Sequence, residues 1–209
     1  MKKAWKPTLP PFRKFKRDVY LKHSKTAGFI YQLGEGAVIR TKSQEIPVAA
    51  IAAPETKEKI AYLKKCLLRY RAITGMGRGI AAIQVGIPQR FAVIYMLDTK
   101  DIMTIINPVI TKKSHSLLRF PEGCMSEGPL FAPVTRPSWI EFSYYDEQGQ
   151  KQYWNTKDEN QRDKITNRVF QHEIDHMDGV IFLDRADLRN LTLESDPAYY
   201  DKAAFEEVE

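Results

Sequence analysis

The stretch His172-Glu173-Ile174-Asp175-His176 decides the fold and the chemistry of this chain. Two histidines four positions apart project about 40° from each other on an α-helix, because one turn holds roughly 3.6 residues. Their imidazoles can therefore share one metal ion. The glutamate after the first histidine then lies beside the metal, where its carboxylate can accept a proton.

The elements around this stretch favour an α+β fold. Apolar residues recur on one side of residues 162–177, which predicts a buried helix that ends at Gly179. Upstream, the sequence predicts a helix and several strands. These are a helix over 54–73, strands over 90–96 and 103–112, and a hairpin of 139–146 with 151–155. Strands that precede one ligand-bearing helix indicate α+β rather than an alternating βαβ chain.

A histidine pair needs a third ligand, and Cys124 is the candidate. It lies 48 residues before His172, in a glycine-containing loop that can bend close to a ligand. A thiolate suits a soft or borderline metal such as iron(II) or zinc. Three protein ligands leave one position open for water, as in catalytic sites. A buried cysteine can instead be a small hydrophobic residue, and an HExxH pattern also occurs in helices without metal.

A second glycine-rich segment, residues 77–84, offers hydrogen-bond donors for a developing oxyanion. Its two glycines allow close approach of the backbone, and Gln84 carries an amide N–H. The same segment resembles a dinucleotide-binding loop. That alternative fails because a helix precedes the segment, where a dinucleotide fold requires a strand.

Charge is unevenly distributed along the 209 residues, whose net charge is +6. Residues 1–25 hold nine Lys or Arg and one acid, whereas residues 194–209 hold six acids and one base. Five prolines and little periodicity over residues 1–54 predict an extended arm with short local structure. No apolar run approaches the ~20 residues of a membrane span. We expect a basic extension over 1–40, a catalytic domain over 41–187 and an acidic tail over 188–209.

Three motifs in this order resemble those of peptide deformylase, over roughly residues 40–187. They are Gly77-x-Gly79-x-Ala81-Ala82-x-Gln84, then Glu122-Gly123-Cys124-Met125-Ser126, then Gln171-His172-Glu173-Ile174-Asp175-His176. The flanking runs Ile106-Asn107-Pro108 and Met177-Asp178-Gly179 agree with the family as well.

This resemblance implies a hydrolase that removes the formyl group from N-formyl-methionine of nascent chains. The implied fold has antiparallel sheets around the ligand-bearing helix. Cys124, His172 and His176 would hold one divalent metal, Fe²⁺ by preference, with Zn²⁺ as a substitute. Glu173 would be the general base and acid.

The resemblance also implies roles around the metal. Gln84 and the backbone N–H of Met125 would polarise the formyl oxygen. The substrate side would include Gly77, Arg78, Gly79, Glu122 and Gly123, with Glu122 behind the metal ligands.

The sequence departs from the family pattern at Arg78, where an aliphatic residue is usual, at Ile83, where proline or a small residue is usual, and in residues 127–131. Arg78 either contacts acidic residues of the substrate or extends into solvent. Two other functions stay open: an endopeptidase of the HExxH class, and a degenerate member that binds formyl-peptides or ribosomes without turnover. We expect a bacterial cytoplasmic protein, with an organelle as the alternative. The basic arm either contacts ribosomal RNA or packs on the domain.

Overall fold

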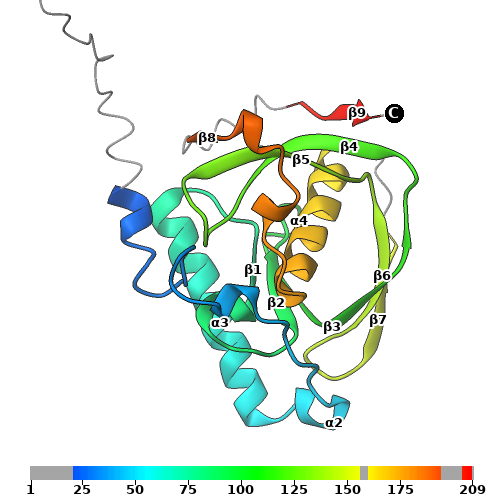
Figure 1. Ribbon diagram of the computed structural model, residues 1–209. Helices are drawn as coiled ribbons and strands as arrows, with labels where there is room; N and C mark the ends of the chain where they lie inside the picture. The colour runs from blue at the N-terminus through cyan, green and yellow to red at the C-terminus, as the bar shows by residue number, and fades with distance from the viewer. Residues whose placement is uncertain (1–20, 156–159, 194–203, 209) are drawn as a thin grey trace, which may run out of the picture.

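The computed structural model describes residues 21–155, 160–193 and 204–208 (Figure 1). Its helices are η1 (Val38–Arg40), α2 (Val48–Ile51), α3 (Pro54–Thr74), η2 (Ala82–Val85), α4 (Gln161–Met177), η3 (Phe182–Asp184) and η4 (Leu188–Asn190). Its strands are β1 (Gly79–Ala81), β2 (Phe91–Tyr95), β3 (Ile102–Lys113), β4 (Leu117–Gly123), β5 (Leu130–Pro137), β6 (Ile140–Tyr145), β7 (Lys151–Trp154), β8 (Thr192–Leu193) and β9 (Glu206–Val208). None of the described helices is long and apolar enough to cross a bilayer.

The strands form two antiparallel sheets. One has the order β1-β2-β3-β6-β7, and the other has the order β8-β5-β4-β9. Strand β3 contains a bulge at Asn107-Pro108: Asn107 has a φ of 50°, and the register with β6 shifts between Ile106 and Val109. The predicted hairpin is β6–β7, where Phe142 pairs with Trp154.

Helix α4 lies between the two sheets, as Figure 1 shows. Its Phe170, Ile174 and Met177 are buried against the inner face of the five-stranded sheet, where Phe142 belongs to the same cluster. Burying each such side chain stabilises the fold by about 1.5–3 kcal/mol. Antiparallel sheets around a ligand-bearing helix are the predicted architecture, so the expected fold class is confirmed.

The bounds of α4 follow from local chemistry. Its N-cap, Asn160, accepts a hydrogen bond from the backbone N–H of Asp163, which satisfies one free donor of the first turn. Gly179, with a φ of 76°, turns the chain away just after the helix. Ile181 and Phe182 then return to the interior and are buried.

Helix α3 packs against β1 and β2 on the other side of the five-stranded sheet. It begins with Pro54 at its first turn and ends at Gly75, which adopts the left-handed conformation. Both ends agree with the prediction. Ile60, Leu63 and Leu67 are fully buried in the core cluster on this side.

From residue 21 onward, the N-terminal part differs from the expected extended arm. Ile30, Ile39, Ile46 and Ile51 are buried, so the segment packs on the domain, whereas the short helices η1 and α2 are the kind of local structure that was expected. These isoleucines are far apart in the sequence and separated by turns, so they give no helical or strand periodicity. Their burial could therefore not be predicted from the sequence. Residues 1–20 of the basic extension lie outside the described residues.

Strands β4 and β5 were not expected. Polar and proline residues interrupt the apolar pattern of both strands, so the sequence shows no clear alternation. In the structure, burial does alternate along β4, where Leu118, Phe120 and Glu122 face inward. In the C-terminal region, β8 and β9 add short edges to this sheet, and residues 194–203 lie outside the described residues.

Candidate active site

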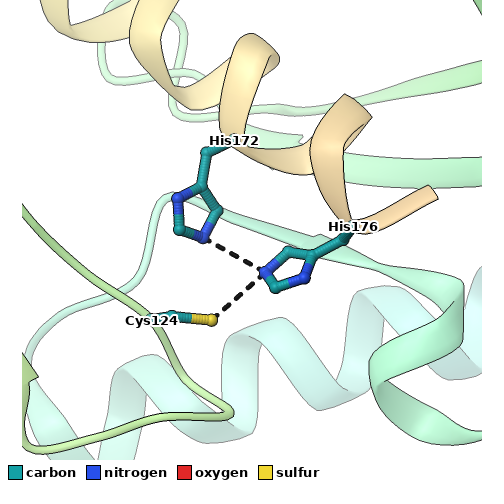
Figure 2. A group of neighbouring side chains, drawn as sticks. All are labelled: Cys124, His172 and His176. Carbon is teal, nitrogen blue, oxygen red and sulfur yellow. Dashed lines mark hydrogen bonds between the residues drawn. The ribbon is translucent and has the colours of Figure 1, made fainter. Parts of the chain in front are cut away.

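Cys124, His172 and His176 meet between α4 and the turn after β4 (Figure 2). The Cys124 Sγ lies 3.2 Å from the His176 Nε2, which lies 3.2 Å from the His172 Nε2. The three ligand atoms lie within 4.8 Å of one another. The two imidazole rings lie together because they are four residues apart on α4. Cys124 reaches them because it directly follows the end of β4 at Gly123.

Glu122 orients His172 from behind. Its Oε2 lies 3.1 Å from the His172 Nδ1, which leaves the Nε2 turned toward Cys124 and His176. Such a carboxylate fixes the tautomer and direction of a ligand histidine. Burial raises the pKa of Glu122, but Arg136, the hydrogen bond with His172 and the charge of Arg168 together outweigh it and hold this pKa well below its usual range.

A buried ion network continues behind Glu122. The Arg136 Nε and Nη2 donate to Glu122 at 2.7 and 3.0 Å, and the Arg136 Nη1 donates to Asp175 at 2.6 Å. Arg168 donates to Glu122 at 2.5 Å, and Arg185 donates to both oxygens of Asp175. This network ties α4 to β4 and β5, and therefore fixes the distance between His172 and Cys124.

Glu173 lies beside the cluster and against β1. It is 3 % exposed, and its Oε2 has no hydrogen-bond partner among the described residues. Burial raises the pKa of Glu173 to about 7. A Cβ on Gly79 would lie 2.5 Å from the Glu173 Oε1, so only glycine allows this approach.

Gln84 points its amide at the cluster from η2. Its Oε1 accepts a hydrogen bond from the Ala81 backbone N–H at 2.8 Å, which fixes the amide plane. Its Nε2 then faces the Cys124 Sγ at 3.5 Å and the Ser126 Oγ at 3.1 Å. The backbone N–H of Met125 directly follows Cys124, so both suggested oxyanion donors lie at the same end of the site.

These residues line a cavity of about 670 Å³. The predicted residues on its wall are Gly77, Arg78, Gly79, Gln84, Glu122, Gly123, Cys124, Met125, His172 and Glu173. His176, 1 % exposed, lies deeper. The structure therefore brings together the predicted metal ligands, catalytic residues and substrate-side residues.

Arg78 does not extend into solvent. It is half-buried, and its Nε donates to the Tyr95 carbonyl at 3.1 Å while its Nη2 donates to the Thr166 Oγ1 at 3.3 Å. It lies on the cavity wall.

Sequence reasoning missed several residues of this site. Arg136 lies on the same face of β5 as Val134, so an alternating pattern would have placed it inward once the strand was recognised. His23 lines the cavity and is 7 % exposed, with its Nδ1 unpartnered among the described residues. It lies against Gly128, whose added Cβ would meet the ring at 2.4 Å. No motif around His23 indicated this position.

The donor set fits a divalent metal. One sulfur and two imidazole nitrogens converge, the second nitrogen of His172 is held by a carboxylate, and the chain supplies no fourth ligand among the described residues. Burial raises the pKa of the Cys124 thiol when no cation is present, and a bound cation reverses this effect.

An α+β fold, a Cys-His-His cluster with one open side and a buried glutamate beside it define a metal-dependent hydrolase. Comparison with known proteins gives the family. The sequence profile described as Polypeptide deformylase matches residues 29–191, so the chain belongs to the polypeptide deformylase family.

Individual relatives agree. The peptide deformylase of Picosynechococcus sp. is 35 % identical over 164 residues, which cover 76 % of this chain and 78 % of the relative. That of Pelagibacter ubique is 37 % identical over 111 residues, 52 % of this chain and 61 % of the relative, so this match spans less than two thirds of its length. The crystal structure of peptide deformylase from Thermotoga maritima superposes with a TM-score of 0.65 at 28 % identity, covering 76 % of this chain and 96 % of that one.

Proposed function

We propose that this chain removes the formyl group from N-formyl-methionine at the start of nascent polypeptides. Water adds to the formyl carbon, the C–N bond breaks, and the products are formate and a peptide with a free α-amine. The observation that carries the proposal is the buried Glu173 beside the Cys124, His172 and His176 cluster, in a chain that belongs to this family.

Cys124, His172 and His176 hold one divalent metal in this proposal. The thiolate and two imidazoles suit iron(II), with zinc as a substitute. When bound, such an ion acts as a Lewis acid that lowers the pKa of a water and polarises a carbonyl.

Glu173 manages the proton. Its free Oε2 accepts a proton from the attacking water and returns it to the leaving amine nitrogen, so the carboxylate is regenerated in each cycle. The Gln84 Nε2 and the Met125 N–H donate hydrogen bonds to the formyl oxygen as negative charge develops there. Because Gln84 is already held by Ala81, its amide needs little reorganisation.

The rest of the peptide lies along the cavity wall formed by Gly77, Arg78, Gly79 and Gly123. Strand β1 is at the edge of its sheet, so its free side can pair with an extended peptide. Glu122 contributes through His172 rather than by contact with the substrate.

We also infer a bacterial cytoplasmic enzyme that meets its substrates at the ribosome. Residues 1–25 hold nine basic residues interleaved with aromatic ones, a composition that favours salt-sensitive contact with RNA. The acidic C-terminal region is poorly suited to such contact.

The experiment follows formate release from formyl-Met-Ala-Ser, with acetyl-Met-Ala-Ser as the control, on protein purified without oxygen. We expect turnover of the formyl peptide only. Hydrolysis of internal peptide bonds would favour an endopeptidase, and binding without formate release would favour a degenerate member.

Glu173→Gln separates binding from chemistry, because it keeps the size of the side chain and removes the base. We expect kcat to fall ~10²–10⁴-fold, the usual effect of losing a positioned proton-transfer group, while the metal stays bound. Turnover close to that of the unmodified protein would mean that another residue acts as the base.

A further inference from the structure

Two guanidinium groups on the cavity wall, those of Arg71 and Arg78, have only neutral partners among the described residues. We propose that Arg78, with Arg71 beside it, makes the enzyme prefer formylated peptides that carry an acidic side chain just after formyl-methionine. This inference rests on the proposed function and deepens it, because it names the class of peptide that the site prefers.

Arg78 is hydrogen-bonded only to neutral groups among the described residues, and the nearest carboxylate that acts on its charge, that of Asp98, is paired with Arg162. Its two hydrogen bonds go to a backbone carbonyl, that of Tyr95, and to a hydroxyl, that of Thr166. Neither partner carries a charge. The guanidinium has five N–H donors, so others remain for a ligand.

Arg71 reaches the same place from α3. Its Nη1 donates to the Gly77 carbonyl at 2.5 Å, and its guanidinium lies 3.8 Å from the centre of the Tyr95 ring. Both arginines therefore contact Tyr95, one through its backbone and the other through its ring. Two neighbouring cations without an ion-pair partner among the described residues create a positive potential on the cavity wall.

The other arginines of the cavity differ in this respect. Arg168 pairs with Glu122, and Arg162 pairs with Asp98. Burial, and then the charge of Arg71, lower the pKa of Arg78 to about 10, so Arg78 is still charged at neutral pH. An aliphatic residue would cover this wall without the cost of partly burying a charge.

The position of Arg78 indicates which part of the substrate it meets. Gly79 touches Glu173 and therefore marks the reacting end of the peptide. Arg78 is one residue farther along the wall, and an extended peptide advances about 3.3 Å per residue. A long arginine side chain there reaches the second or third residue of the substrate.

The test compares kcat/KM for formyl-Met peptides of one length that carry Glu, Gln or Lys at the second and at the third position. We expect the Glu peptide to exceed the Lys peptide at one of these positions by about 5-fold, the effect of a weak, partly solvated ion pair. In Arg78→Met, the ratio should fall to near one while the Gln peptide is still turned over. Arg78→Lys should keep part of the ratio.

Arg69→Met is the matched control. Arg69 is exposed on the same helix as Arg71, with its guanidinium over the Phe29 ring, and it does not line the cavity. This variant loses the same charge and should keep the preference for Glu. In the unmodified protein, the Glu-to-Gln ratio should also fall as salt rises, which tests the proposal even if Arg78→Met does not fold.

Turnover of all peptides without a preference for Glu, or an unchanged ratio in Arg78→Met, would overturn this inference alone. Absence of turnover on every formyl peptide would instead overturn the proposed function.

Discussion

At the scale of single residues, Gly79 sets the position of the catalytic carboxylate. Its Cα has no room for a side chain, because an added Cβ would lie 2.5 Å from the Glu173 Oε1 and 2.7 Å from its Cγ. We expect Gly79→Ala to displace Glu173 and lower kcat by roughly 10²-fold, since small misplacements of a reacting group have large effects. Metal content should not change.

Gly28→Ala is the control for this prediction, because an added Cβ there meets no atom within 4 Å. Kinetics and thermal melting of both variants distinguish a displaced Glu173, which lowers kcat, from a general loss of stability, which lowers the melting temperature. A Gly79→Ala protein with unchanged kcat would show that β1 does not position the carboxylate.

The residues that could be predicted are those whose chemistry depends on spacing along the chain. His172, Glu173 and His176 are neighbours on one helix, so their geometry follows from the helical repeat. Cys124 follows from its motif. Arg136 and His23 could not be predicted, because strand pairing and chain packing bring them to the site from distant segments.

At the scale of elements, long periodic segments were predictable and short ones were not. The bounds expected for α3 and α4 differ from those observed by one residue at most, because proline, glycine and apolar repeats mark them. Strands β4 and β5 were not predicted, because buried Glu122 and Arg136 occupy inward positions that apolar residues normally fill.

The testable prediction at the scale of elements concerns the N-terminal segment. Residues 1–20 hold seven of the nine bases of residues 1–25, and His23 and Thr26 are buried in the described part. Deleting residues 1–20 should therefore keep turnover of a short formyl-Met peptide, while affinity for ribosomes falls and loses much of its salt dependence. Ribosome affinity that does not change would contradict the proposed contact. A lower melting temperature would show that this arm packs on the domain.

At the scale of the whole molecule, two sheets close around one helix, and a buried ion network between that helix, α4, and the four-stranded sheet holds the site together. Glu122 of β4, Arg136 of β5 and Asp175 of α4 form one buried chain of charges. The sequence predicted the α+β class, but the closure depends on pairings between distant segments, which no local pattern encodes.

The central claim is that Cys124, His172 and His176 hold the metal on which turnover depends. The most direct measurement is the metal content per chain, determined together with formate release, on protein purified without oxygen and on Cys124→Ala and His172→Ala. We predict about one divalent metal per chain in the unmodified protein, and loss of both metal and turnover in each variant. Full metal content or full turnover in both variants would contradict the account.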